Sequence, residues 1–289
     1  MNNKIEIEIK DSFNLEDIFE CGQCFRWNKA EDGSYVGIIK DSVVKVKKEK
    51  DKVTFEGTSV GNESFKDIIY EYFDLNTDYR ELKDILRKVD SNMKEAISFG
   101  EGIRILNQDL WECIISFIIS ANNNIPRIKG IIERISKNYG RKIEFEGKEY
   151  YLFPTPEELS KASKEDLRAL GTGFRDIRIY NTTKKIFEDK EYLSRIENLS
   201  STDEMREELL KLDGVGPKVA DCILLFSLKR FDVFPIDVWV RRVMNDLYIH
   251  AQDEDRINKK EILKIANDKF GSLSGLAQQY LFYWKREEN

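Results

Sequence analysis

The fold of the C-terminal half is decided by one stretch, Leu209-Leu210-Lys211-Leu212-Asp213-Gly214-Val215-Gly216-Pro217-Lys218-Val219-Ala220-Asp221-Cys222. Leu209 and Leu212 end one helical pattern, and the two glycines allow a tight turn because glycine adopts positive φ at little cost. Pro217 then opens a second helix, as proline does at a first helical position. The stretch therefore predicts two helices joined by a short hairpin that contains Gly214 and Gly216.

The second helix of this hairpin begins with backbone N–H groups that have no intrahelical acceptor. Such groups can bind a phosphate without any basic side chain. An ordinary helical hairpin that binds nothing has the same glycines, so the turn alone leaves both interpretations open. A phosphate clip explains how a chain with a formal net charge of −6 can hold nucleic acid, although the charge itself argues mildly against it.

Lys218 lies in the first turn of the second helix, where the helix dipole disfavours a cation. An amine that attacks carbon must be neutral, so a nucleophilic Lys218 needs a pKa roughly two or three units below its ordinary value. Burial can lower the pKa of a lysine by up to ~3–5 units, whereas the dipole contributes less than one. The alternative is a lysine that contacts phosphate or water.

Two further residues belong to this hypothesis. Cys222 follows Lys218 by one helical turn and shares its face, so its thiol can form the floor of a pocket, although plain core is the common role. Asp237, in Phe234-Pro235-Ile236-Asp237-Val238-Trp239, has the position of a helix N-cap. As a catalytic carboxylate it would stabilise positive charge on a sugar. We expect it near Lys218 but not in a closed ion pair, which would raise the lysine pKa.

The remainder of the chain divides into a β part and a helical part. Ile5, Ile7 and Ile9 alternate with glutamates, and short β-rich runs follow up to Phe55, separated by turn residues. From about Phe65 the period is helical to the end. The sequence predicts an α+β fold: an antiparallel sheet domain over 1–100 and a mostly helical domain over 101–289.

Composition excludes several classes of protein. No apolar run of the 289 residues is long enough to span a membrane, and the first ten residues lack the apolar stretch of a signal peptide, so a cytoplasmic protein is expected. Cys21 and Cys24 form a lone CxxC without a second ligand pair, and His250 is the single histidine, so we expect no metal held by side chains.

The stretch Gly214–Cys222 with Pro235-Ile236-Asp237-Val238 resembles the helix–hairpin–helix, Gly/Pro–Asp superfamily of DNA glycosylases, and within it the 8-oxoguanine DNA glycosylase/AP lyases. The resemblance implies a TBP-like N-terminal sheet. It also implies that the protein needs no cofactor, apart from a structural monovalent cation at the hairpin backbone. Further matching runs are Gly22-Gln23-Cys24-Phe25-Arg26-Trp27, Ser120-Ala121-Asn122-Asn123-Asn124-Ile125-Pro126-Arg127, Leu170-Gly171-Thr172-Gly173-Phe174-Arg175 and Ala277-Gln278-Gln279-Tyr280-Leu281-Phe282.

The resemblance also implies roles for single residues. Lys218 would attack C1′ of the damaged nucleotide and form a Schiff base that permits β-elimination, with Asp237 supporting cleavage of the glycosidic bond. The base pocket would be built from Gly22, Cys222, Phe226, Gln278 and Phe282. The Gly22 carbonyl would accept a hydrogen bond from N7–H, which 8-oxoguanine has and guanine lacks.

Other residues would contact duplex DNA around the flipped nucleotide. The protein is expected to be a monomer associated with the nucleoid, with duplex DNA as its partner. Asn122 resembles the wedge that fills the gap left by the base, while Arg127 and Arg175 resemble readers of an opposite cytosine and Phe174 inserts beside it. Phe174 stands in place of a tyrosine, Phe226 in place of a smaller residue, and Trp239 in place of a phosphate-binding histidine.

Two other functions remain open from the sequence. One is a different helix–hairpin–helix glycosylase that acts on alkylated or other oxidised bases. The endonuclease III type would end in four cysteines that hold an iron–sulfur cluster, but the last cysteine here is Cys222. The other is a non-catalytic DNA-binding module, which would not need Lys218, Cys222 and Asp237 in this arrangement.

Overall fold

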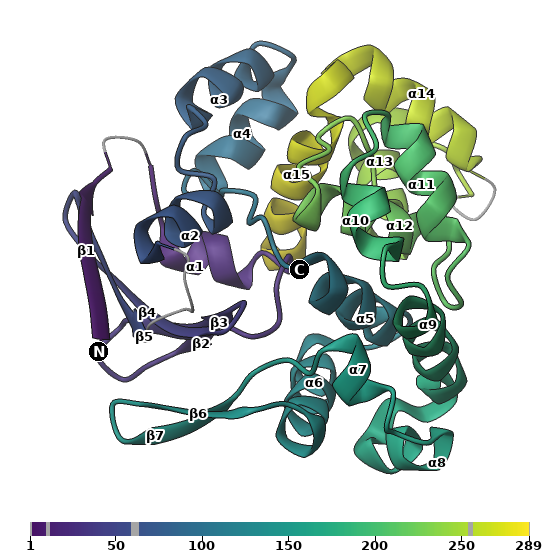
Figure 1. The fold of residues 1–289 in the computed structure, drawn as a ribbon. Helices are drawn as coiled ribbons and strands as arrows, with labels where there is room; N and C mark the ends of the chain where they lie inside the picture. The colour runs from purple at the N-terminus through teal and green to yellow at the C-terminus, as the bar shows by residue number, and fades with distance from the viewer. Residues whose placement is uncertain (1, 10–11, 59–63, 254–256, 289) are drawn as a thin grey trace.

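A computed structural model describes residues 2–9, 12–58, 64–253 and 257–288 of the chain. Figure 1 shows an antiparallel sheet on one side and a larger group of helices on the other. This arrangement confirms the predicted α+β fold, with a sheet domain first and a helical domain after it.

The N-terminal sheet has the strand order β1-β5-β4-β3-β2 in the described residues, and neighbouring strands run antiparallel. In β1, Ile5 pairs with Phe55 and Ile7 with Val53, so the isoleucines pack on the core while the intervening glutamates are exposed. The predicted period of two is therefore confirmed. The strands are β1 (Asn2–Glu8), β2 (Asn28–Lys29), β3 (Tyr35–Ile39), β4 (Ser42–Glu49) and β5 (Lys52–Thr58).

A short helix, α1 (Leu15–Glu20), interrupts the first sixty residues, which the sequence predicts as β structure throughout. Asn14 caps it by accepting a hydrogen bond from the Glu16 N–H at 2.9 Å. Phe19 stacks on Trp27 at a centroid distance of 4.2 Å beneath the sheet. The prediction is wrong here because a six-residue helix with one capping residue leaves too short a period to read.

The helical period predicted from Phe65 onward is confirmed by a series of helices. They are α2 (Phe65–Tyr72), α3 (Tyr79–Arg87), α4 (Ser91–Phe99), α5 (Leu110–Ser120), α6 (Ile125–Tyr139), α7 (Pro156–Leu159), α8 (Lys164–Leu167), α9 (Asp176–Glu188), α10 (Tyr192–Glu197), α11 (Thr202–Leu210), α12 (Pro217–Ser227), α13 (Val238–Met244), α14 (Lys259–Phe270) and α15 (Ser274–Glu288). Short helical turns η1 (Arg168–Thr172), η2 (Gly173–Arg175), η3 (Asn245–Ile249) and η5 (Gly271–Leu273) join some of them.

One element departs from the predicted helical pattern after residue 65. Strands β6 (Lys142–Phe145) and β7 (Lys148–Tyr151) form an antiparallel hairpin whose turn has positive φ at Glu146 and Gly147. Its Phe145 packs with Ile38 of the N-terminal sheet. The prediction of helix to the end of the chain is wrong in this segment, which is too short for either period to dominate.

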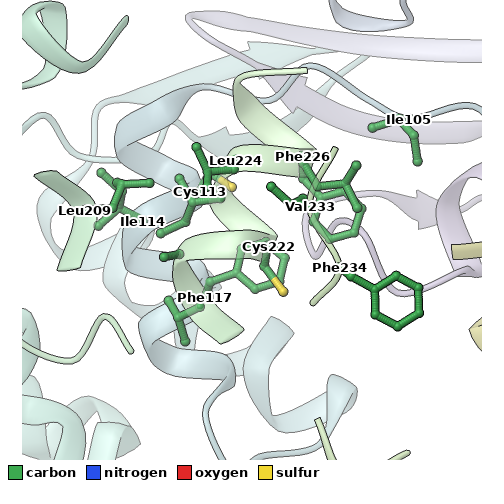
Figure 2. Close-up of a cluster of buried hydrophobic side chains, with 14 of the residues drawn as sticks. Ile105, Cys113, Ile114, Phe117, Leu209, Cys222, Leu224, Phe226, Val233 and Phe234 are labelled. Carbon is green, nitrogen blue, oxygen red and sulfur yellow. The ribbon is translucent and has the colours of Figure 1, made fainter. Parts of the chain in front are cut away.

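Helix α5 lies at the centre of the larger hydrophobic core, which α12 and α15 share. Figure 2 shows Cys113, Ile114 and Phe117 of α5 in one cluster with Cys222, Leu224 and Phe226 of α12. Tyr79 and Met93, from α3 and α4, belong to this core as well. A division at residue 100 stays a prediction, but α12 and the elements that surround it are fixed by one continuous core.

Candidate active site

The predicted hairpin joins α11 to α12, and its two glycines play different parts. Gly214 has a φ of +86°, and a Cβ there would lie 2.9 Å from Cβ of Arg178. Gly216 has φ −92° and ψ 179°, which is extended backbone that any residue can adopt, and a Cβ there would meet nothing within 4 Å. The expectation of positive φ is therefore correct for Gly214 and wrong for Gly216. Nothing inside the protein requires that residue 216 lack a side chain.

Gly216 is the N-cap of α12, and Pro217 is its first residue, as the sequence predicts. No side chain caps this helix. In the part of the chain that the structure describes, the N–H groups of Lys218 and Val219 find no backbone or side-chain acceptor. The start of α12 is thus an exposed group of free donors of the kind that binds anions.

Lys218 projects from the first turn of α12 toward α5. Its Nζ lies 5.5 Å from the centroid of the Phe117 ring, and Cys222 is one turn further along the same face. Within the described ranges, no carboxylate oxygen lies within 4.0 Å of the Lys218 Nζ, so the amine forms no ion pair there. The amine is half-buried, beside an aromatic ring and a thiol.

The pKa of Lys218 differs from the expectation. Burial is the largest influence and lowers the pKa, but the Cys222 sulfur and the Asp237 carboxylate raise it, and the balance lies above the ordinary value. The expected lowering is therefore wrong for the protein without DNA, because two neighbouring groups favour the charged amine more than burial opposes it. Burial also raises the pKa of Cys222, to about 11, so both groups hold their protons at neutral pH.

Asp237 caps α13, where one carboxylate oxygen accepts a hydrogen bond from the Val240 N–H at 2.8 Å. Among the described residues the other oxygen accepts no hydrogen bond. The carboxylate is close enough for its charge to act on Lys218, yet the two form no ion pair. This is the arrangement expected of a carboxylate that stabilises positive charge near the amine without binding the amine itself.

The aromatic wall beside Lys218 is formed by α5 and α12. Phe226 stacks on Phe117 at a centroid distance of 5.6 Å, and Phe25 meets Phe117 edge to face at 5.5 Å. Figure 2 shows Cys222 and Phe226 on the same side of α12 as Phe117. Cys222 and Phe226 are buried. They can therefore form the wall or floor of a pocket only if the aromatic wall is accessible to a ligand from the side on which Lys218 lies.

Gly22 and α15 bring the two ends of the chain together. Gly22 has a φ of +87°, and a Cβ there would lie 3.4 Å from Cε1 of Phe282. Gln278, one turn before Phe282, is 6% exposed, and within the described residues its amide has no hydrogen-bond partner. Gln278 and Phe282 share one face of α15, so an amide without a protein partner and an aromatic ring can both meet a polar planar ligand.

Sequence reasoning missed two residues on this helix. Gln279 donates from Nε2 to the Cys21 carbonyl at 2.6 Å, and Arg286 donates from Nη2 to the Glu20 carbonyl. They are seven residues apart, which is two helical turns, so they share one face of α15. This spacing was readable, but nothing in the sequence indicated that the face meets the Gly22 loop.

A second group of predicted residues lies between α5, α6 and α9. Asn122 is exposed with a φ of +52°, and Phe174 is 54% exposed. Arg175, in contrast, is 2% exposed and donates hydrogen bonds to the carbonyls of Ala121, Asn122 and Thr172. Arg175 therefore ties the Asn122 turn to the Phe174 turn, and its role as a reader of the opposite base stays a prediction.

Two further arginines, Arg127 and Arg178, lie near the turn that carries Phe174. The guanidinium of Arg178 lies 5.5 Å from the centroid of the Phe174 ring. Burial, together with the charges of Arg127 and Arg178, lowers the pKa of Arg175. Within the described residues, neither Arg127 nor Arg178 forms an ion pair. This uncompensated positive cluster gives a chain of net charge −6 a local surface for a polyanion.

Trp239 is 40% exposed at the start of α13, and the neighbouring Val238 is 58% exposed. The indole of Trp239 is thus accessible from solvent, and its contact with a DNA backbone stays a prediction.

All four cysteines, Cys21, Cys24, Cys113 and Cys222, are buried free thiols. Within the described ranges, no three His, Cys, Asp or Glu side chains gather closely enough to hold a metal ion. The same ranges contain no helix with the length and apolar character needed to cross a bilayer.

Comparison with known proteins identifies the family. Residues 4–114 match the family model described as 8-oxoguanine DNA glycosylase, N-terminal domain, and residues 115–268 match the HhH-GPD superfamily base excision DNA repair protein model. An N-glycosylase/DNA lyase of Saccharomyces cerevisiae is 32% identical over 94% of this chain and 83% of its own length.

Solved structures agree with these matches. The 8-oxoguanine glycosylase/lyase of Clostridium acetobutylicum, in complex with double-stranded DNA containing cytosine opposite 8-oxoG, is 44% identical and superposes with a TM-score of 0.92 over 100% of this chain and 98% of its own. A protein named MBOgg1, in complex with a low-affinity DNA ligand, is 47% identical, with a TM-score of 0.92 over 99% of this chain and 96% of its own. The chain belongs to the 8-oxoguanine DNA glycosylase family of the HhH-GPD superfamily of base excision DNA repair proteins.

Proposed function

We propose that this protein flips 8-oxoguanine out of duplex DNA, cleaves its N-glycosidic bond and nicks the resulting abasic site by β-elimination. The observation that carries the proposal is the position of Lys218: a half-buried amine at the open start of α12, within the electrostatic reach of an unpaired Asp237 carboxylate. A structural lysine would be expected to pair with that carboxylate. The names of the yeast and clostridial relatives support the same reaction.

In the proposed mechanism, the neutral Lys218 amine attacks C1′ as the C1′–N9 bond breaks and the base departs with that electron pair. The deoxyribose ring then opens to a Schiff base. Loss of a C2′ proton expels the 3′ phosphate, because the iminium accepts the electrons. Asp237 stabilises the positive charge that develops on the sugar. Because the pKa of Lys218 is raised in the free protein, loss of its proton is a separate step that DNA binding must promote.

The base pocket of this proposal is formed by Gly22, Cys222, Phe226, Gln278 and Phe282. Phe282 stacks on the flipped base while the unpaired Gln278 amide bonds its Watson–Crick edge. The Gly22 carbonyl accepts the N7–H of 8-oxoguanine, whereas guanine presents a lone pair there. An unpaired buried acceptor costs about 1–3 kcal/mol, so earlier steps of flipping must add to the selectivity.

The DNA surface includes the hairpin and the positive cluster. Gly216 supports this, because the protein gives no reason for the missing side chain and the helix start behind it has free donors. Gly214 shapes the turn and Trp239 donates from its indole to the backbone. On the other side, Asn122 fills the gap left by the base. The residues proposed to face the opposite cytosine are Arg127, Phe174 and Arg175.

The turn also has oxygen atoms that fit a monovalent cation. The carbonyls of Gly214 and Val215 accept no hydrogen bond from the described residues, and hard cations prefer such oxygens. A bound cation would hold the turn against a phosphate and would take no part in the chemistry. The proposal includes no other cofactor and no iron–sulfur cluster, and it describes a cytoplasmic monomer with a domain boundary near residue 100.

Borohydride trapping on DNA containing 8-oxoguanine opposite cytosine tests the proposal. The wild-type protein should become covalently linked to the DNA because borohydride reduces the Schiff base. Lys218→Gln should bind the DNA but not trap, while Lys211→Gln, which removes an exposed lysine that pairs with Glu208, should trap normally. No trapping by the wild type would favour a non-catalytic module, and trapping by Lys218→Gln would refute the assignment of the nucleophile. Preference for an alkylated base would indicate a different glycosylase.

A further inference from the structure

The loop that carries Gly22 is held by one face of α15. Gln279, 2% exposed, donates to the Cys21 carbonyl at 2.6 Å, and Arg286 donates to the Glu20 carbonyl. These are the two carbonyls that directly precede Gly22 in the chain. The backbone is therefore fixed on the N-terminal side of Gly22 by two side chains that come from the other end of the protein.

The C-terminal side of Gly22 is fixed as well. Gln108 donates from Nε2 to the Gln23 carbonyl at 2.7 Å, and its own N–H donates to the Phe226 carbonyl at 2.9 Å. The Gln23 side chain accepts from the Leu106 N–H at 2.8 Å. The carbonyls on both sides of Gly22 are thus bonded. Among the described residues, that of Gly22 accepts no hydrogen bond and stays available to a ligand.

Arg286 also touches Gly22 and Phe282 directly. Its Nη1 is buried without a hydrogen-bond partner and lies 3.1 Å from the position of a Cβ on Gly22. Its guanidinium carbon is 5.4 Å from the centroid of the Phe282 ring. Helix α15 therefore carries both groups of residues. Gln278 and Phe282 are proposed to face the base, while Gln279 and Arg286 hold the loop that contains Gly22.

We infer that Gln279 and Arg286 are positioning residues that fix the direction of the Gly22 carbonyl relative to Phe282, and so set the preference for a purine with a hydrogen on N7. The inference rests on the proposed function. A carbonyl discriminates N7–H from a lone pair only if it cannot rotate away from the base, because a mobile loop would relieve the repulsion. Hydrogen bonds to the two preceding carbonyls prevent that rotation.

The test measures affinity in a Lys218→Gln background, where DNA is bound but not cut. The readout is the ratio of the Kd for guanine DNA to the Kd for 8-oxoguanine DNA. Gln279→Leu and Arg286→Met should each lower this ratio about tenfold, which corresponds to one hydrogen bond of about 1.4 kcal/mol. Affinity for DNA with an abasic analogue should stay within about twofold, because that ligand has no base to orient.

Two further variants separate positioning from general stability. Arg286→Lys keeps a donor for the Glu20 carbonyl and should restore most of the ratio. Arg230→Met is the matched control, since Arg230 is another partly buried arginine that donates to a carbonyl, that of Leu199 at 3.3 Å, outside the site. It should leave the ratio unchanged.

The inference is overturned if Gln279→Leu and Arg286→Met keep the wild-type ratio, or if affinity for abasic DNA falls in parallel with it. If Gln279→Leu does not fold, Arg286→Met decides, because the Arg286 side chain is 20% exposed and its replacement disturbs the core less. A parent protein that does not prefer 8-oxoguanine DNA over guanine DNA would instead overturn the proposed function. The two failures are therefore distinguishable.

Discussion

Replacing each hairpin glycine by alanine should separate the two parts they play. At Gly214, φ of +86° costs an alanine about 1–2 kcal/mol, and its Cβ would lie 2.9 Å from Cβ of Arg178 and 3.2 Å from Cγ2 of Ile118. Overpacking of this kind adds about 1 kcal/mol or more. Gly214→Ala should therefore lower the free energy of unfolding by about 2–3 kcal/mol, and the Tm by roughly 5–10 °C.

Gly216→Ala should weaken DNA binding while leaving stability nearly unchanged. Its extended backbone tolerates alanine and its Cβ would meet nothing within 4 Å, so stability should change by less than about 1 kcal/mol. If a phosphate approaches this backbone, the methyl group displaces it and removes hydrogen bonds to a charged group of about 1.5–3 kcal/mol, or roughly tenfold to a hundredfold in Kd.

Two measurements on the same pair of variants separate the effects. Urea unfolding measures stability. Fluorescence anisotropy measures the affinity for 8-oxoguanine DNA, with proteins that also carry Lys218→Gln. The expected result is a crossed pattern: Gly214→Ala loses stability, and Gly216→Ala loses affinity at full stability. Wild-type affinity for Gly216→Ala would refute the reasoning, because it would mean that nothing approaches the start of α12.

Two other predictions concern the wedge and the nucleophile. Arg175→Met should lower both the Tm and the rate of 8-oxoguanine excision, the rate by about tenfold or more, because three carbonyls lose their donor and the Asn122 turn relaxes. Arg127→Met replaces an exposed side chain and should leave the Tm unaltered. An Arg175→Met protein that is stable and fully active would contradict this prediction. Trapping on abasic DNA should speed up as pH rises from about 6 to 9, because the pKa of Lys218 is raised and each pH unit frees about tenfold more neutral amine. A flat pH profile would contradict this cause.

Local rules predicted the parts of the site that depend on neighbouring residues in the chain. Pro217 begins α12, Lys218 lies in its first turn, and Asp237 caps α13. Each follows from the geometry of a helix end, which a few adjacent residues determine. The alternation in β1 was readable for the same reason, because a half-buried strand repeats every two residues.

Properties that depend on distant residues were not predictable in this way. The raised pKa of Lys218 results from a balance between burial and the neighbouring groups Cys222 and Asp237, and no sequence pattern measures the size of either effect. The engaged donors of Arg175 and the contact of Arg286 with Gly22 join segments far apart in the chain. Sequence pattern identifies which residues share a helix face, but not which loop that face meets.

The burial of all four thiols has a consequence for survival under oxidising conditions. Peroxides attack the thiolate, and burial raises the pKa of Cys21 to about 12 and that of Cys222 to about 11, and holds those of Cys24 and Cys113 well above their usual range. Almost no thiolate therefore exists near neutral pH. The four cysteines are therefore poor targets for the oxidants that damage guanine, which suits a protein proposed to repair that damage.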